Sequence, residues 1–207
     1  MTKLPGKTVE RLSEYRRTLI NCLNEGKDFI YSHELAQMHH KTAVQVRRDI
    51  MLMGFSGLQR KGYDIKEMIA AISRILDSPD GQNVAIIGIG HLGTAILNYF
   101  KGKRSKLNIQ ALFDTDPDKN DRLIEGIPCY HPDQMAEIIQ KYRINIAILT
   151  VPPEHATESK EKLIEAGIRG ILNFTTVPLR VPDHVYLEEY DMITSIEKVA
   201  YFSFKQN

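Results

Sequence analysis

The stretch Gly88–Gly93 constrains the fold of this chain more than any other, because its glycines follow the spacing G-x-G-x-x-G. The apolar run Val84–Ile87 precedes it and is typical of a strand that is buried on both faces. The run Thr94–Phe100 follows it and predicts a helix. Strand, glycine-rich turn and helix form the context in which a dinucleotide pyrophosphate meets the N–H groups of a helix N-terminus. We therefore expect a nucleotide-binding turn here.

The glycines of this turn have separate tasks. Gly88 allows the tight bend, Gly90 lets a pyrophosphate approach the backbone, and Gly93 lets the helix pack closely on its strand. The predicted cofactor site therefore begins with the whole turn: Gly88, Ile89, Gly90, His91, Leu92 and Gly93.

The choice of nucleotide depends on Asp114, which ends a second predicted strand (residues 109–113) and follows Gly93 by 21 residues. A carboxylate at this place accepts hydrogen bonds from the hydroxyls of the adenosine ribose. It would repel a 2′-phosphate, and Thr115 and Asp116 stand where an arginine would receive one. The sequence therefore predicts NAD(H) in preference to NADP(H).

Strand and helix patterns alternate from residue 82 to residue 174, with further buried strands at 144–150 and 170–174. This alternation predicts a doubly wound parallel sheet, in which ligands bind at the carboxyl ends of the strands. Those ends add five residues to the predicted cofactor site: Thr150, Val151, Pro152, Asn173 and Phe174. The alternative for Pro152 and Pro153 is that they only terminate the strand.

The composition fits a globular chain of 207 residues with 43% hydrophobic residues. Without an apolar run of about 18 residues or an apolar segment near the N-terminus, we expect no membrane span, no secretory signal and a cytoplasmic location. Cys22 and Cys129 are expected to be buried, reduced thiols. His39 and His40 have no Cys or His ligand spacing around them, so no metal site is predicted.

The charge is divided unevenly along the chain. Residues 1–62 carry 11 Lys and Arg against 6 Asp and Glu, whereas the remaining residues carry 16 against 20. A positive first part favours a polyanionic partner, although a solvated surface is the simpler alternative.

The basic part has the pattern of a helix-turn-helix, with helices expected from Thr8 to about Asn24, over 33–38, and after Thr42. In the third helix the apolar residues Ala43, Val46, Ile50 and Met53 share one face. The helix would enter the major groove, where Gln pairs with adenine and Arg with guanine. The residues predicted to contact DNA from it are Thr42, Val44, Gln45, Arg47 and Arg48. The alternative is a three-helix module that only mediates dimer contacts.

The segment Gly54–Tyr63 contains three glycines and the adjacent cations Arg60 and Lys61, which suits a short β-hairpin wing against a phosphate backbone. A helix is expected over 65–76, capped by Asp64, and the chain then breaks at 78–81. The predicted domains are a winged-helix DNA-binding domain, residues 1–80, and a Rossmann-type NAD(H)-binding domain, residues 81–207.

The tail contains a predicted helix, residues 192–204, with apolar residues on more than one face. Such a surface would cause aggregation if left in water, and a partner subunit is the simple way to cover it. We expect this helix to mediate dimerisation.

The sequence does not favour an enzyme. The nucleotide domain uses nearly everything after Gly81, which leaves no substrate domain. Tyr99 and Lys103 have the Y-x-x-x-K spacing of short-chain dehydrogenases, but too early in the fold, and His155 has no identifiable acid or base partner. We predict no catalytic residue and a ligand-switched DNA-binding protein.

Several stretches together resemble the Rex family of bacterial redox-sensing transcriptional repressors. They are Arg11-Leu12 with Tyr15, Thr42–Asp49, Gly88–Gly93, Phe113–Pro117, Leu149–Pro152 and Gly170–Phe174. The resemblance implies winged-helix and Rossmann domains, a homodimer that exchanges its C-terminal helix, and release from operator DNA when NADH binds. It also implies a switch in which Asp191 pairs with Arg17 of the other subunit in the DNA-binding state and with the hydroxyl of Tyr99 in the NADH state. Leu58–Lys61 interrupts the glycine-rich wing of the family, which leaves operator preference open.

Two other functions remain open from the sequence alone. One is an NAD-dependent oxidoreductase with an accessory helical domain. The other is a CoA- or nucleotide-binding module without a DNA role.

Overall fold

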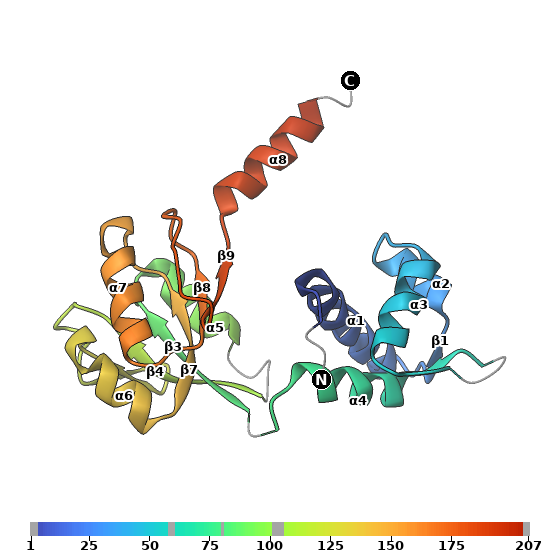
Figure 1. Cartoon of the computed structure of the whole chain (residues 1–207), viewed down its shortest axis with the longest axis horizontal. Coiled ribbons are helices and arrows are strands. Elements are labelled where there is room, and N and C mark those ends of the chain that lie inside the picture. Colours follow the sequence, from blue (N-terminus) through green and yellow to red (C-terminus); the bar gives the residue numbers. More distant parts are fainter. Residues whose placement is uncertain (1–3, 58–60, 80, 101–105, 205–207) are drawn as a thin grey trace. The chain divides into compact units, whose positions relative to one another are not determined.

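The computed structural model describes residues 4–57, 61–79, 81–100 and 106–204. The chain forms two compact units, Met1–Pro79 and Asp80–Asn207, and Figure 1 labels most of their elements.

The first unit is mainly helical. Its elements are α1 (Gly6–Asn24), β1 (Phe29–Ile30), α2 (Ser32–Met38), α3 (Ala43–Leu52), β2 (Tyr63–Asp64) and α4 (Ile65–Leu76). Leu12, Tyr15 and Leu19 are completely buried because their three- and four-residue spacing places them on one face of α1. They pack in one core with Val46 and Ile50 of α3 and with apolar residues of α4.

The beginnings of two helices show how local chemistry sets the boundaries. α1 begins before Thr8, because the extended backbone of Pro5 provides the N-cap and its carbonyl accepts the N–H of Thr8 at 2.9 Å. Asp64 caps α4 as predicted, and its carboxylate accepts the N–H of Glu67 at 2.9 Å.

The predicted hairpin within Gly54–Tyr63 includes residues 58–60, which lie outside the described residues, so it stays a prediction. β2 pairs antiparallel with β1, so that Ile30 lies opposite Tyr63 and Phe29 opposite Asp64. The strand partner therefore comes from the segment before α2, which the turn glycines of 54–63 do not indicate. Arg60 lies outside the described residues.

The second unit is an α/β structure. Its elements are β3 (Gln82–Ile87), α5 (His91–Phe100), β4 (Leu107–Phe113), β5 (Arg122–Ile124), β6 (Ile127–Tyr130), the 3₁₀ turn η1 (Pro132–Gln134), α6 (Met135–Lys141), β7 (Ile144–Leu149), α7 (Pro153–Glu165), β8 (Gly170–Asn173), β9 (Tyr186–Glu189) and α8 (Met192–Phe204). The sheet order is β5-β6-β4-β3-β7-β8-β9, and only the edge pair β5–β6 is antiparallel. The chain winds outward from β3 in both directions, so β3 and β7 flank the crevice in which such sheets bind ligands.

Both faces of this sheet are covered, which explains the unbroken apolar run of β3. Val84 and Ile86 pack in a core with Leu97 of α5, whereas Ala85 and Ile87 pack in a second core with residues of α6 and α7. The alternation of side chains along a strand produces this division. Both cysteines are free and buried, as predicted.

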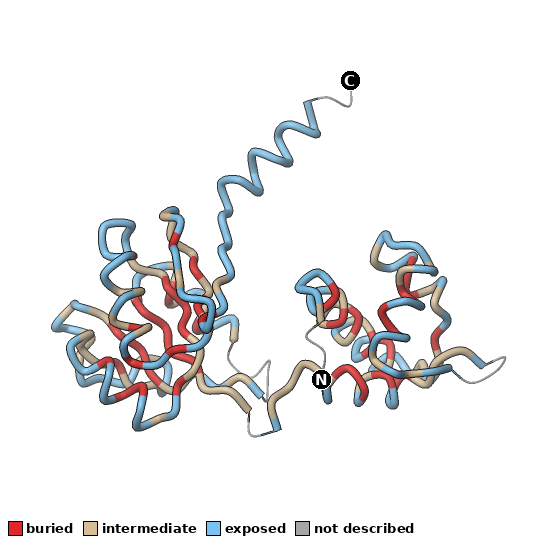
Figure 2. The backbone as a smooth tube through the Cα atoms, viewed as in Figure 1, coloured by how far each residue is buried: buried red, intermediate tan, exposed pale blue. Residues whose placement is uncertain are grey.

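The C-terminal helix α8 is exposed along its whole length (Figure 2). Ile196 is 68% exposed, Val199 69% and Phe204 85%. Among the residues that the structure describes, no helix is long and apolar enough to cross a membrane.

Candidate dinucleotide site and nucleic-acid interface

The glycine turn between β3 and α5 has little space for side chains. Gly88 has a φ of +90°, and a Cβ there would lie 3.0 Å from the carbonyl carbon of Thr150. A Cβ at Gly93 would collide with the carbonyl oxygen of Gly88. Around Gly90, by contrast, no atom of the described residues lies within 4 Å of an added Cβ. The turn is therefore closed toward the sheet and open toward a ligand at Gly90.

Thr150 ties the end of β7 to this turn. Its hydroxyl lies 2.7 Å from the carbonyl oxygen of Gly88 and 3.0 Å from that of Ile87, to either of which it donates. This hydroxyl fixes the carboxyl ends of β3 and β7 against each other, at the edge where the topology places the ligand.

Asp114 joins β4 to the same turn. Its Oδ2 accepts the N–H of Ile89 at 2.7 Å, and its Oδ1 accepts the N–H of Asp116 at 2.9 Å. The ammonium of Lys119 lies 3.1 Å from Oδ2 and 3.4 Å from the carboxylate of Asp116. Burial lowers the pKa of Lys119, but the two carboxylates outweigh it and raise that pKa above its ordinary value. The position predicted for the ribose thus carries an ion-paired aspartate with acceptor capacity left on Oδ1.

A cavity of about 480 Å³ opens over the carboxyl ends of β3, β4 and β7. Six of the residues predicted to bind cofactor line it: Gly88, Gly90, Asp114, Thr150, Val151 and Pro152. The sequence reasoning missed several other lining residues, which are Lys119, Pro132, Met135, Glu158, Ser159 and Lys162. They come from η1, α6, α7 and the loop after β4. Of the polar residues of α7 among them, Lys162 follows Ser159 by three residues and Glu158 by four, a helical spacing that was the available signal.

His155, considered above as an isolated base, also lines this cavity. Lys162 ion-pairs with Glu158 at 3.0 Å, which raises the pKa of Lys162.

The remaining predicted cofactor residues have other surroundings. Ile89 is buried and His91 is exposed at the beginning of α5. Asn173 is buried, and its side chain holds the following loop by donating to the carbonyl of Val177 at 2.9 Å and accepting the N–H of Thr175 at 3.0 Å. The ring of Phe174 packs against that of Tyr190 with centroids 5.3 Å apart.

The outer face of α3 is where the predicted DNA contacts lie. Thr42 caps the helix by accepting the N–H of Gln45 at 3.1 Å. Val44 is 63% exposed, and Arg47 and Arg48 are exposed beside it. Arg47 donates to the hydroxyl of Ser32 at 3.1 Å, which links α3 to the beginning of α2. Lys61 is exposed in the loop before β2.

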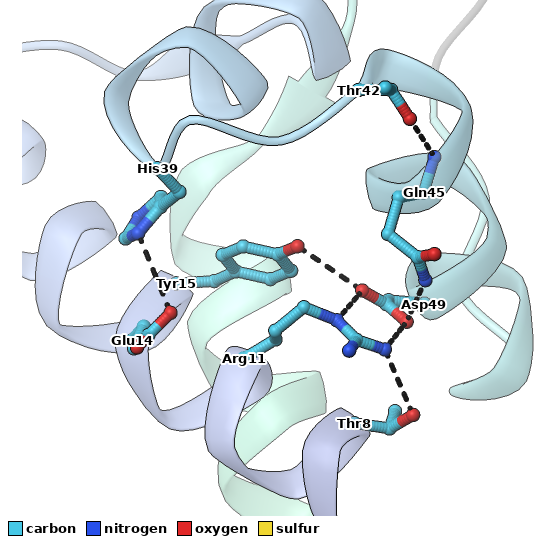
Figure 3. A network of polar contacts seen from close by, with 8 residues as sticks. All are labelled: Thr8, Arg11, Glu14, Tyr15, His39, Thr42, Gln45 and Asp49. Atoms are coloured by element: carbon cyan, nitrogen blue, oxygen red, sulfur yellow. Dashed lines mark hydrogen bonds and ion pairs between the residues drawn. The ribbon is translucent and has the colours of Figure 1, made fainter. Parts of the chain in front are cut away.

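The inner face of α3 carries a buried carboxylate that the sequence reasoning missed (Figure 3). Asp49 is completely buried and accepts two hydrogen bonds of 2.7 Å from the guanidinium of Arg11. The hydroxyl of Tyr15 lies 3.1 Å from Asp49, and the side-chain amide of Gln45 donates to it at 3.0 Å. Burial and the Asp49 carboxylate raise the pKa of Tyr15, and the same carboxylate raises that of Arg11. The available signal was position 49, which lies three residues after Val46 on the core face.

The three residues implied for the switch lie on different elements. Arg17 is exposed on α1, and Tyr99 is 61% exposed near the end of α5. Asp191 precedes α8 and caps it, because its carboxylate accepts the N–H of Ile193 at 2.8 Å and the hydroxyl of Thr194 at 2.6 Å. These bonds lower the pKa of Asp191, so its carboxylate is charged at neutral pH.

Comparison with known sequences identifies the class of protein. Residues 80–177 match the family described as "CoA binding domain", and residues 3–50 match the family described as "Putative DNA-binding protein N-terminus". Together with the cavity and the exposed helix α3, these matches define a DNA-binding protein controlled by a nucleotide. The redox-sensing transcriptional repressor Rex of Leuconostoc citreum is 39% identical over 97% of this chain and 93% of its own length. The chain therefore belongs to the Rex family of redox-sensing transcriptional repressors, which confirms the resemblance in the sequence motifs.

Solved structures of the family have the same fold. The Rex-family repressor RSP in complex with β-NAD⁺ and operator DNA matches with a TM-score of 0.89 and 32% identity, over 98% of this chain and 93% of that one. RSP in complex with β-NADH matches with a TM-score of 0.86 and 32% identity, over 98% and 95%. The predicted fold class, a helical DNA-binding domain followed by a Rossmann-type domain, is confirmed.

Proposed function

We propose that this chain represses transcription by binding operator DNA when NADH is scarce, and that it leaves the operator when NADH occupies the cavity of the second unit. It acts as a transcriptional repressor and not as an enzyme. The observation that carries the proposal is one chain with two features: a cavity bordered by a glycine turn and Asp114, and an exposed basic helix α3. The complexes of RSP with NAD⁺ and operator DNA, and with NADH, support the same pairing of ligands.

The residues that line this cavity indicate how NAD(H) would lie in it. We propose that the pyrophosphate lies over Gly90 at the open side of the turn, where α5 begins. The adenosine ribose then lies at Asp114 and Lys119. Thr150, Val151 and Pro152 line the end of β7, and Asn173 and Phe174 support the neighbouring strand end.

DNA binding is assigned to the outer face of α3, with Thr42, Val44, Arg47 and Arg48 toward the duplex. Arg60 and Lys61 belong to the loop that we expect to meet the phosphate backbone. The excess of Lys and Arg in the first unit would attract the negatively charged phosphates of a duplex.

A second copy of the chain is the proposed partner of α8. The helix exposes apolar side chains around its circumference, and such an exposed apolar surface is unfavourable in water. Exchange of α8 between two subunits would bury them, and a dimer also fits an operator with two half-sites. Because a bacterial repressor works on the chromosome, we place the dimer in the cytoplasm.

The test is a fluorescence-anisotropy titration of labelled upstream DNA with the protein, in the absence and presence of NADH. NADPH and CoA at equal concentration serve as ligand controls, and absorbance at 340 nm in the same cuvette follows any NADH oxidation. Binding that NADH alone reverses supports the proposal. Steady NADH turnover without DNA binding would identify an oxidoreductase, and release by CoA would identify a CoA-responsive protein.

A further inference from the structure

The carboxylate of Asp49 holds α3 on α1. It is completely buried, and its two oxygens receive Arg11 and Tyr15 from α1 and Gln45 from α3 itself (Figure 3). Burying a charge is unfavourable unless it is paired and hydrogen-bonded, so each of these donors matters to the packing of the helix. The orientation of α3 therefore depends on a full set of donors around Asp49.

Gln45 cannot read a base and hold its hydrogen bond to Asp49 with the same orientation of its side chain. A glutamine that reads adenine in the major groove presents both its amide oxygen and its NH₂ to the base. Here the NH₂ of Gln45 donates to Asp49 at 3.0 Å, one turn farther along the same helix. Rotation of this side chain toward DNA would remove a donor from a buried carboxylate, which is costly.

We propose that Gln45 is a positioning residue that acts through Asp49, and that it fixes the presentation of α3 instead of reading a base. Base recognition from this helix then falls to its outer face, on which Val44 and Arg48 are exposed. This inference rests on the proposed function, because it presupposes that α3 meets operator DNA.

The main experiment uses a profile of operator variants. The operator is first selected from a random duplex library with the unmodified protein, and each base pair is then substituted in turn. Gln45→Ala is expected to weaken the selected operator by roughly two- to tenfold, the range covered by the net contribution of one hydrogen bond. The penalty at every base pair should stay the same, because no base contact has been lost.

If Gln45 contacted a base directly, Gln45→Ala would give a different profile of penalties. Losing one direct contact abolishes discrimination at that base pair, where a mismatch normally costs roughly 5- to 150-fold. Loss of the penalty at a single base pair in Gln45→Ala would therefore overturn the proposal.

Tyr15→Phe supplies the internal reference. Tyr15 is completely buried and donates to the same carboxylate, so its hydroxyl cannot touch DNA. Its variant should weaken the operator with an unchanged profile, as Gln45→Ala does. Gln140→Ala, on the exposed face of α6 in the other unit, should leave operator affinity unchanged.

A double-mutant cycle with Asp49→Asn separates a positioning role from a contact that is independent of Asp49. If Gln45 acts through Asp49, the two substitutions together should weaken the operator less than the product of the single losses. Multiplicative losses would contradict the proposal. Circular dichroism confirms folding of each variant, and if Asp49→Asn does not fold, the comparison with Tyr15→Phe decides alone. Failure of the unmodified protein to select any operator would instead refute the proposed function itself.

Discussion

At the scale of single residues, we propose that Asp114 and Lys119 decide the choice between NADH and NADPH. The carboxylate repels a 2′-phosphate, while the ammonium 3.1 Å away would attract one. The second carboxylate of Asp116, 3.4 Å from Lys119, leaves the three side chains with a net negative charge. NADH should therefore bind more tightly than NADPH.

Replacing Asp114 should shift this balance. Asp114→Ala removes an acceptor for the ribose and leaves Lys119 free to meet a 2′-phosphate, so NADH affinity should fall by at least tenfold, or about 1.4 kcal/mol, and NADPH affinity should rise. Titration by nicotinamide fluorescence measures both affinities. Adding Lys119→Met to Asp114→Ala should cancel the gain for NADPH. Equal affinities of the unmodified protein for the two nucleotides would contradict this assignment.

Among the elements, α3 and α8 carry the proposed functional surfaces of the two units. On α3, Arg48 is exposed beside Val44, away from the buried Asp49. If Arg48 reads a base, Arg48→Ala should cost about 1–3 kcal/mol on the selected operator and less on random DNA. If Arg48 contacts only a phosphate, Arg48→Ala should reduce the affinity for the selected operator and for random DNA equally. The affinity should then also depend less steeply on the salt concentration. Anisotropy titrations at several salt concentrations distinguish the two, and unchanged affinity would exclude both roles.

The predicted role of α8 is tested by a charge placed on its apolar surface. Val199→Asp should reduce dimerisation, because the 69% exposed valine would no longer bury apolar area against a second copy. Sedimentation velocity measures the fraction of dimer in the variant and in the unmodified protein. Lys198→Asp introduces the same residue at the adjacent, polar position and should leave the dimer intact. If the unmodified protein sediments as a single chain, α8 does not mediate dimerisation.

Most elements could be predicted from the sequence because their signals are local. Unbroken apolar runs give β3 and β7, the three- and four-residue spacing of apolar residues gives α1, and the caps give the beginnings of α3 and α4. The pairing of β1 with β2 could not be predicted, since each strand has only two residues and its partner lies far away in the chain. Asp49 was missed for the same reason, because its partner Arg11 lies on another helix far away in the chain. Lys119 was missed because a lysine in a polar loop gives no signal of the carboxylates that it will contact after folding.

At the scale of the whole molecule, the two units must be coupled for NADH to affect DNA binding. A ligand shifts an equilibrium only through its different affinities for two states. The proposed coupling is the change of partner of Asp191, from Arg17 of the other subunit to the hydroxyl of Tyr99. In the structure this carboxylate caps α8, so a change of its partner would act directly on the helix that we propose for dimerisation.

The coupling predicts a specific pair of variants. Tyr99→Phe should bind NADH normally but respond weakly to it on DNA, because the hydroxyl that would receive Asp191 is absent. Asp191→Ala should uncouple the two sites and also weaken the cap of α8. Operator dissociation constants across an NADH series measure both effects, and Thr194→Val, which removes only a partner of the cap, controls for the loss of capping. Normal responses of both switch variants would exclude this route, even for a working redox sensor.

The most direct test of the account is the operator dissociation constant of the unmodified protein across an NADH series at constant NAD⁺. We expect the constant to rise by roughly 5- to 150-fold at saturating NADH, the range of typical coupling free energies. Saturating operator DNA must weaken NADH binding by the same factor, because linkage is reciprocal. An operator dissociation constant that does not change with NADH would contradict the account.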